Sequence, residues 1–379
     1  MGNNNSKKQK QKLIENKNNK NGFNIHLTSK YISDITFFCD YEKKYKGISN
    51  ANIESGKPFN NYIFLIVGLI DGFIEIYKDI FESEFKLALS FQAHRDIISK
   101  ILQLKRNGYL LTGSFDNSLK VFKLSKNCTK ESLIYTFYLD IIFNRIYDMI
   151  KIQNEDYLLI SVFNHIIYFP YSKNNLSEEK NYLSDYHHSK VQHNKNYLNN
   201  LLEINKQLFL ALDDNEYKIL FFQLITIDNI YKDIIFKKSI LINYKEKKSD
   251  NDLNTKICIE NLFPKYKLIL VSIHNYIEII DINYLEIISI HELIEKPFYF
   301  FYNFEIECLF ILERNNIFKY KISLEKCDID FLYAGKENME LRIKNGLENT
   351  KKSIYNQNNN NVVFLFDKRY LIKIEMNFT

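Results

Sequence analysis

The feature that most constrains the fold is a pair of segments that match each other at a fixed offset along the chain. Residues 62–77 (YIFLIVGLIDGFIEIY) and 110–124 (LLTGSFDNSLKVFKL) each contain an apolar stretch, a polar turn and a stretch with alternating apolar residues. When the two are aligned without a gap, Asp71 falls on Asp116, at an offset of 45 residues. The chain therefore contains an internal repeat whose unit is built from short strands joined by a tight turn.

The same unit recurs five more times further along the chain. Each copy keeps an apolar strand, a polar turn and a second strand, and the copies lie at 157–169, 208–222, 268–281, 308–321 and 362–374. A repeat of this length that contains only strands is typical of a β-propeller blade. We therefore predict an all-β chain that forms a seven-bladed β-propeller of four-stranded antiparallel blades.

Composition divides the chain into a basic tail and a neutral body. Residues 1–20 contain six lysines and one glutamate, which accounts for the net charge of +5, so the remaining residues are formally neutral. A neutral body argues against a nucleic-acid-binding groove, because such grooves need clustered cations. We predict a disordered tail over 1–22 and the propeller over 23–379. Polar inserts between blades are expected near 171–196, 244–256 and 334–361.

The segment from His94 to Phe122 resembles a blade of the WD-repeat β-propeller family. His94 stands where the family has the histidine that precedes the first strand, and Asp116 lies in the turn between the second and third strands. Phe122 occupies the place of the family's tryptophan. The resemblance implies a buried network that runs from Asp116 through His94 to a hydroxyl, supplied by Thr112 or Ser114. Phenylalanine has no N–H to donate, so the last member of the family's network is expected to be missing.

Other units keep less of the family's pattern. Asp71 keeps the turn acid in the first unit, and Asp281 keeps the aspartate of the Trp-Asp pair in the fifth. Propellers of this family commonly close when an N-terminal strand completes the last blade. The resemblance therefore implies that Phe23–Thr28 closes the ring and that Ile35–Cys39 is the innermost strand of the first blade. Closure of this kind removes exposed sheet edges.

The N-terminal residues have the pattern of a lipid anchor. Gly2 follows the initiator methionine, and Ser6 lies at the position favoured in N-myristoylation signals. A single myristoyl chain binds membranes weakly, with an association constant on the order of 10⁴ M⁻¹, so a second signal is needed. Nearby lysines would supply it by contacting anionic lipid, namely Lys7, Lys8, Lys10 and Lys12. The alternative is an Asn- and Lys-rich disordered segment that matches the signal by chance.

No residue pattern in the chain indicates a reaction. The sequence contains no Gly-rich phosphate loop, no G-x-S-x-G and no H-E-x-x-H. His187, His188 and His193 lie close together, but no acid or cysteine accompanies them at metal-ligand spacing, so neither a metal site nor a cofactor is predicted. The five cysteines are scattered and form no C-x-x-C pair, which is typical of a protein in a reducing compartment.

These patterns predict a non-catalytic scaffold or adaptor. Its partners would be proteins or peptides bound on a propeller face, with no nucleic acid. The protein is expected in the cytoplasm, held at the cytoplasmic face of a membrane by its myristoylated tail. Two alternatives stay open: a soluble structural subunit of a larger assembly, and a propeller enzyme with its site at the central channel.

Overall fold

The computed structural model shows an all-β protein. It describes residues 23–28, 30–39, 63–78, 85–104, 109–125, 127–139, 145–152, 157–163, 165–170, 187–190, 198–213, 216–227, 230–242, 257–262, 266–273, 275–293, 299–303, 308–312, 316–325, 328–338, 352–355, 362–367 and 370–375. The prediction of an all-β chain built from antiparallel sheets is confirmed within these residues.

The strands form four-stranded antiparallel sheets whose strands follow one another in the sequence. Three such sheets lie in the first half of the chain and contain β2 (Ile32–Cys39), β3 (Ile63–Leu69), β4 (Phe73–Lys78) and β5 (Lys86–Gln92); β6 (Ile98–Gln103), β7 (Tyr109–Ser114), β8 (Ser118–Leu124) and β9 (Glu131–Tyr138); and β10 (Ile146–Lys151), β11 (Tyr157–Val162), β12 (His165–Pro170) and β13 (His187–Lys190).

The second half of the chain repeats this arrangement. Its consecutive sheets contain β14 (Leu198–Glu203), β15 (Leu208–Asp213), β16 (Lys218–Ile227) and β17 (Ile230–Leu241); β18 (Cys258–Asn261), β19 (Leu268–Ile273), β20 (Tyr276–Asp281) and β21 (Glu286–Glu292); and β22 (Tyr299–Asn303), β23 (Cys308–Leu312), β24 (Asn316–Glu325) and β25 (Asp328–Asn338). A further sheet joins β26 (Lys352–Tyr355), β27 (Val362–Asp367) and β28 (Tyr370–Glu375) to β1 (Phe23–Leu27).

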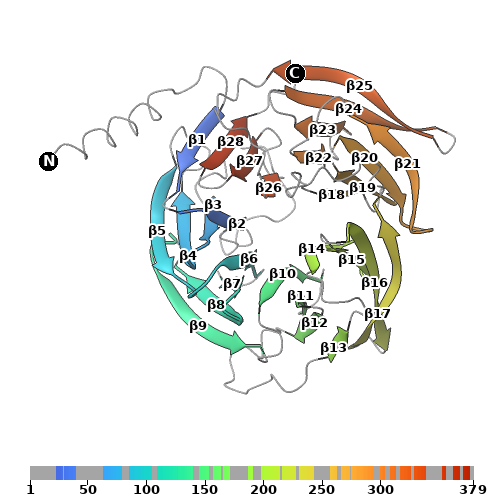
Figure 1. Ribbon diagram of the computed structural model, residues 1–379. Coiled ribbons are helices and arrows are strands. Elements are labelled where there is room, and N and C mark those ends of the chain that lie inside the picture. Colours follow the sequence, from blue (N-terminus) through green and yellow to red (C-terminus); the bar gives the residue numbers. More distant parts are fainter. Residues whose placement is uncertain are drawn as a thin grey trace, which may run out of the picture.

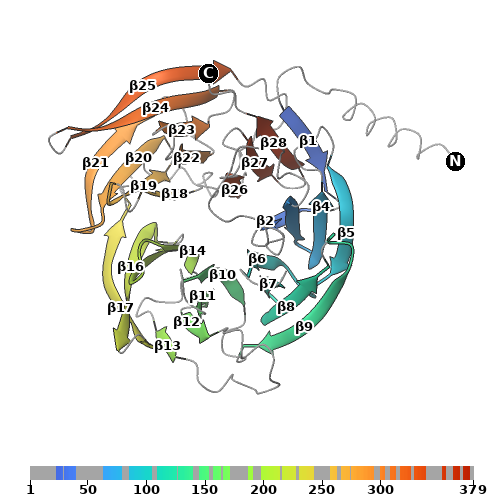
Figure 2. The same cartoon turned by 180° about the vertical axis from the view of Figure 1, so that it is seen from behind.

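The sheets are arranged around a ring, as both faces of the molecule show (Figures 1 and 2). In each sheet built from four consecutive strands, the first strand, such as β2, β6 or β10, lies nearest the centre and the fourth lies at the outer rim (Figure 1). In the remaining sheet β26 lies nearest the centre and β1 lies at the rim. β1 pairs antiparallel with β28, with Phe23 opposite Ile374 and Leu27 opposite Tyr370. The first and last described strands therefore share one sheet, and the arrangement is propeller-like.

Buried side chains hold neighbouring sheets together. Ile74 of one sheet and Ile98 and Phe122 of the next belong to a single cluster of buried apolar residues. Within it the rings of Phe91 and Phe122 meet edge to face, with their centroids 5.2 Å apart. The second strand of a sheet, such as β19, is buried along its whole length, because its alternate side chains belong to two different apolar clusters, one shared with each neighbouring sheet. Each fully buried aliphatic or aromatic side chain stabilises the fold by about 1.5–3 kcal/mol.

One turn geometry recurs around the ring. In each case a residue of the turn between the second and third strands accepts, through its carbonyl oxygen, the N–H of a residue that follows the fourth strand. Gly72, Asn117 and Tyr217 have positive φ angles, a conformation that glycine and asparagine adopt readily and tyrosine adopts rarely. The pairs are Gly72 with Ala93, Asn117 with Leu139, Tyr217 with Ile242 and Asn275 with Leu293.

Two segments that composition predicted to be loops contribute strands. β13 lies within the predicted insert 171–196, and β26 lies within 334–361. Most of their residues are polar, but a strand is held in its sheet by backbone hydrogen bonds, which do not require apolar side chains. His187, for example, lies opposite Tyr168 of β12. The predicted insert 244–256 lies outside the described residues.

Candidate functional site

The turn between β7 and β8 brings Asp116 to His94, which lies between β5 and β6. The ring nitrogen Nδ1 of His94 is 3.1 Å from each carboxylate oxygen of Asp116. On the other side of the ring, Nε2 lies 2.7 Å from Oγ1 of Thr112 in β7. His94 is 1% exposed and Thr112 is fully buried. The structure thus places three of the predicted residues in one enclosed chain of hydrogen bonds.

The protonation states of this network follow from its surroundings. Burial lowers the pKa of His94, and the hydrogen bond and charge of Asp116 only partly oppose that effect, so the imidazole is neutral at pH 7. Burial would raise the pKa of Asp116, but hydrogen bonds from His94, from Ser118 and from the backbone N–H of Arg95 hold it well below its usual range. Nδ1 therefore carries the proton and donates to the Asp116 carboxylate, while Nε2 accepts from the Thr112 hydroxyl.

The two serines near this network have different roles. Ser118, which the sequence analysis did not select, donates from Oγ to Oδ1 of Asp116 at 2.5 Å and also lies 3.1 Å from Nδ1 of His94. Ser114 instead donates to the carbonyl of Asp96 at 3.2 Å and accepts the N–H of Asp116 at 3.0 Å. Of the two hydroxyls considered as the partner of His94, the structure selects Thr112. An Asp-x-Ser turn, with the serine two residues after Asp116, is the sequence signal for Ser118.

Phe122 takes no part in the hydrogen bonds and packs against Phe91 in the core between two sheets. The order of hydroxyl, imidazole and carboxylate in Thr112, His94 and Asp116 is that of a nucleophilic triad. Here, however, the hydroxyl and the imidazole are buried, so a substrate cannot reach the oxygen that would attack. The arrangement is suited to fixing the β5–β6 connection against the β7–β8 turn.

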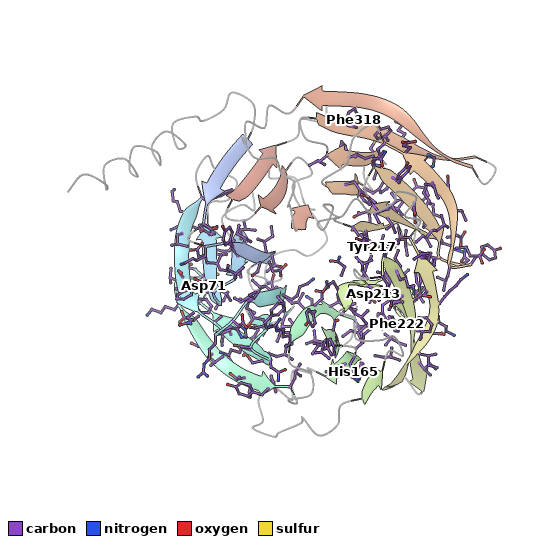
Figure 3. All side chains as sticks on the ribbon, viewed as in Figure 1. Asp71, His165, Asp213, Tyr217, Phe222 and Phe318 are labelled. Carbon is purple, nitrogen blue, oxygen red and sulfur yellow. The ribbon has the colours of Figure 1, made fainter. Side chains whose placement is uncertain are left out.

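The other selected residues lie apart from this network. Asp71 accepts the N–H of Phe73 at 3.4 Å in the β3–β4 turn. Asp281 accepts the N–H of Asn283 at 2.6 Å after β20. Asp213, the last residue of β15, accepts the N–H of Glu216 in the β15–β16 turn. These turn acids are not gathered at one place, since Asp71 and Asp213 lie on opposite sides of the ring (Figure 3). The residues selected for lipidation and membrane contact, Gly2, Lys7, Lys8, Lys10 and Lys12, lie outside the described residues.

A second polar network, which the sequence analysis did not identify, joins the innermost strands. Nζ of Lys100 in β6 lies 2.5 Å from Oδ1 of Asp148 in β10. The other oxygen of Asp148 accepts the N–H of Leu201 in β14 at 2.7 Å, and Asp34 in β2 accepts the N–H of Ile101 at 2.7 Å. Side chains on three inner strands therefore connect four neighbouring sheets.

Position and charge explain this second network. Burial would lower the pKa of Lys100, but the nearby carboxylates of Asp148 and Asp34 outweigh burial and raise it. Each charged residue is third in a similar triplet at the start of an inner strand: Ile32-Ser33-Asp34, Ile98-Ser99-Lys100 and Ile146-Tyr147-Asp148. That recurrence is a sequence signal that places the three charged residues at equivalent positions of successive inner strands, although it does not say which of them pair.

The outer strands expose large apolar side chains. Leu133 and Tyr138 are exposed on β9, Leu87 on β5 and Leu241 on β17. Tyr284, in the turn before β21, is 73% exposed. His94, Thr112, Asp34 and Asp148 are thus enclosed, whereas the rim presents apolar groups to solvent.

Within the part of the chain that the structure describes, no cluster of three or more histidine, cysteine or acidic side chains is arranged to hold a metal ion. The same residues include no helix of the length and apolarity needed to cross a bilayer.

Comparison with known proteins bears on the fold alone. No protein-family model matches the sequence, and no curated protein matches it either. Among solved structures, the chain is similar to Sqt1 of Saccharomyces cerevisiae, with a TM-score of 0.54 and 10% identity. The similarity covers 83% of this chain and 81% of that one. This likeness agrees with the propeller-like ring of four-stranded antiparallel sheets that the structure shows.

Proposed function

We propose that the protein is a non-catalytic scaffold that binds protein or peptide partners. The observation that carries this proposal is the contrast between enclosed polar groups and exposed apolar ones. His94, Asp116 and Thr112 satisfy one another inside the fold, whereas Tyr138 and Tyr284 lie in solvent at the rim. Exposed apolar side chains that recur along one surface are typical of interaction sites. The propeller-like fold supports the proposal, because a rigid ring displays loops and edges at fixed positions.

The proposed scaffold is a seven-bladed ring that β1 closes. The pairing of β1 with β28 supports this closure, since it continues over the whole of β1 from Phe23 to Leu27. The recurrence of the four-stranded sheet from β2 to β25, followed by the sheet that holds β26, supports the blade count. A ring closed in this way resists opening, because strands from both ends of the chain are hydrogen-bonded to each other in one blade.

The proposed location is the cytoplasmic face of a membrane. Gly2, Ser6 and the lysines that follow support it, because they combine an acylation signal with a basic segment that anionic lipid attracts. The test is metabolic labelling with a myristate analogue in cells that express the wild type or Gly2→Ala. Label and membrane sedimentation in the wild type alone are expected. A wild type that is unlabelled and sediments no more than Gly2→Ala removes the anchor and favours a soluble subunit of an assembly.

The scaffold function itself is tested by quantitative affinity capture from native extracts. The full chain is compared with Tyr138→Asp and Tyr284→Asp, which alter exposed rim positions, and with Lys78→Asp, an exposed strand residue outside the apolar rim set. Partners that are lost with a rim variant and retained with Lys78→Asp are expected. Identical capture by all four proteins would contradict partner binding at these rim positions.

A further inference from the structure

The outer edge of β21 has a chemical pattern that defines a ligand. Along Glu286–Glu292 the exposed residues alternate with partly buried ones, so that two isoleucines lie in solvent between two exposed glutamates. Ile288 is 44% exposed and Ile290 is 40% exposed. In the described part of the chain, β21 is the last strand of its sheet and pairs with β20 alone. We infer that this edge binds an extended segment of a partner protein that has apolar residues at its centre and Lys or Arg near both ends.

The backbone of an edge strand supplies the affinity in this mode of recognition. Its outward N–H and C=O groups can pair with an added strand, while side-chain contacts select the sequence of that strand. Proteins commonly protect such edges with lysine. The outer strands β5, β13, β17 and β25 each contain at least one lysine, whereas β21, β9 and β1 contain none. β21 therefore lacks the usual protection against strand addition, and among the strands without lysine only β21 has a glutamate at each end.

Charge selects the kind of partner. Glu286 and Glu292 flank the isoleucines, and the cation that pairs with Glu286 is Lys238 of the neighbouring sheet, at 3.0 Å. The side chains of both partners are exposed to solvent, so the ion pair is weak and a cation of the added strand can take the place of Lys238. Glu292 accepts a neutral hydrogen bond from Asn275 at 3.2 Å. Both ends of the edge thus favour a cationic residue on the added strand, because opposite charges in cross-strand pairs stabilise a sheet.

The same charges disfavour a second copy of the chain. An antiparallel pairing that places Ile288 opposite Ile290 of another copy also places Glu286 opposite Glu292. Like charges directly opposite each other destabilise a strand pair. A different protein with basic flanks fits the edge without that repulsion.

The experiment uses the full chain and two capped, fluorophore-labelled heptapeptides, Lys-Thr-Val-Thr-Val-Thr-Lys and Glu-Thr-Val-Thr-Val-Thr-Glu. Both read the same in either direction, so strand polarity does not affect the comparison. Fluorescence anisotropy is expected to show at least tenfold tighter binding of the lysine peptide. In the double variant Glu286→Lys/Glu292→Lys the preference is expected to reverse. Ile290→Asp is expected to abolish binding, and Leu133→Asp, on the exposed edge strand β9, is expected to leave it unchanged.

Equal binding of the two peptides, an unchanged preference in the charge-reversed variant, or equal losses in Ile290→Asp and Leu133→Asp would each overturn the inference. Circular dichroism and thermal unfolding of every variant identify any that fails to fold, and the two glutamates are exposed enough for their replacement to leave the fold intact. The inference rests on the proposed scaffold function but uses neither extract nor membrane. Its failure would remove the β21 site, while partner capture and myristate labelling would still decide the scaffold and the anchor.

Discussion

The ammonium nitrogen of Lys100 lies 2.5 Å from Oδ1 of Asp148, and this ion pair joins the innermost strands of two neighbouring sheets. Asp148 is largely shielded from water, and its second oxygen continues the connection to the N–H of Leu201. A charge pair that is removed from solvent depends on both partners being present, because either one alone is an uncompensated charge.

Replacing Lys100 is therefore expected to destabilise the protein strongly. Lys100→Met leaves Asp148 and Asp34 without their cation and should cost about 3 kcal/mol of unfolding free energy. Lys238→Met, which removes an exposed ion pair with Glu286, is the matched control and should cost less than about 1 kcal/mol. Urea titrations followed by circular dichroism measure both. Similar midpoint shifts for the two variants would show that the inner pair does not hold the sheets together.

The His94 network makes a second prediction. Asp116→Ala removes the partner of the His94 ring and of the N–H groups of Arg95 and Ser118, and should cost about 3 kcal/mol because buried donors lose a charged acceptor. Asp71→Ala alters an equivalent turn that makes one long hydrogen bond and should cost less than about 1 kcal/mol. Differential scanning calorimetry compares them. Equal shifts in melting temperature would contradict the structural role assigned to the network.

Gly72 provides a steric prediction. Its φ angle is +83°, and an added Cβ would lie 2.2 Å from the carbonyl oxygen of His94. Gly72→Ala is therefore expected to cost more than about 2 kcal/mol, since it combines backbone strain with a clash against main-chain atoms. Asn117→Gly, at a turn with a φ angle of 65°, is the control, because glycine keeps that conformation available. A melting temperature that is lower in Asn117→Gly than in Gly72→Ala would contradict this description of the turn.

The raised pKa of Glu260 leads to a prediction of how the stability of the protein depends on pH. Burial raises the pKa of its carboxyl from 4.5 to about 8, although the N–H of Tyr302 donates to it at 3.3 Å. Between these two pKa values the folded protein binds more protons than the unfolded chain, so stability falls as pH rises from about 4.5 to about 8. The slope due to this group is at most about 1.4 kcal/mol per pH unit, and partial exposure reduces it. Glu260→Gln should remove this contribution from a series of urea titrations, and an unaltered slope would refute it.

The sequence predicted the strands because each repeat keeps a fixed order of apolar stretch, turn and alternating stretch. Asp116, His94 and Thr112 could be brought together in advance because the resemblance placed all three within one blade. Lys100 and Asp148 could not, since a charged residue in a strand gives no sign of which neighbouring strand it will meet. β13 was missed because an outer strand needs little apolar character, and its polar residues read as a loop. The pattern Ile-x-Asp or Ile-x-Lys at successive inner strands shows that part of this information was present.

The enclosed positions of Thr112 and His94 keep this triad from reaching a substrate. Thr112→Val keeps the shape of the side chain and removes the hydroxyl, so it should lower thermal stability by about 1–2 kcal/mol through the hydrogen bond that His94 loses. Partner capture should be unaffected, because Thr112 is buried away from any ligand. A variant with normal stability that loses all partners would place function at this network instead of the rim.

The central claim is that the exposed rim carries the protein's interactions, and site-specific photo-crosslinking in living cells tests it most directly. A photoreactive amino acid is placed at Tyr138 or Tyr284 at the rim, and at Lys78 as an exposed control outside the apolar rim set. Discrete protein adducts are predicted from one or both rim positions and not from position 78. An absence of adducts at both rim positions, or adducts at position 78 alone, would contradict the account.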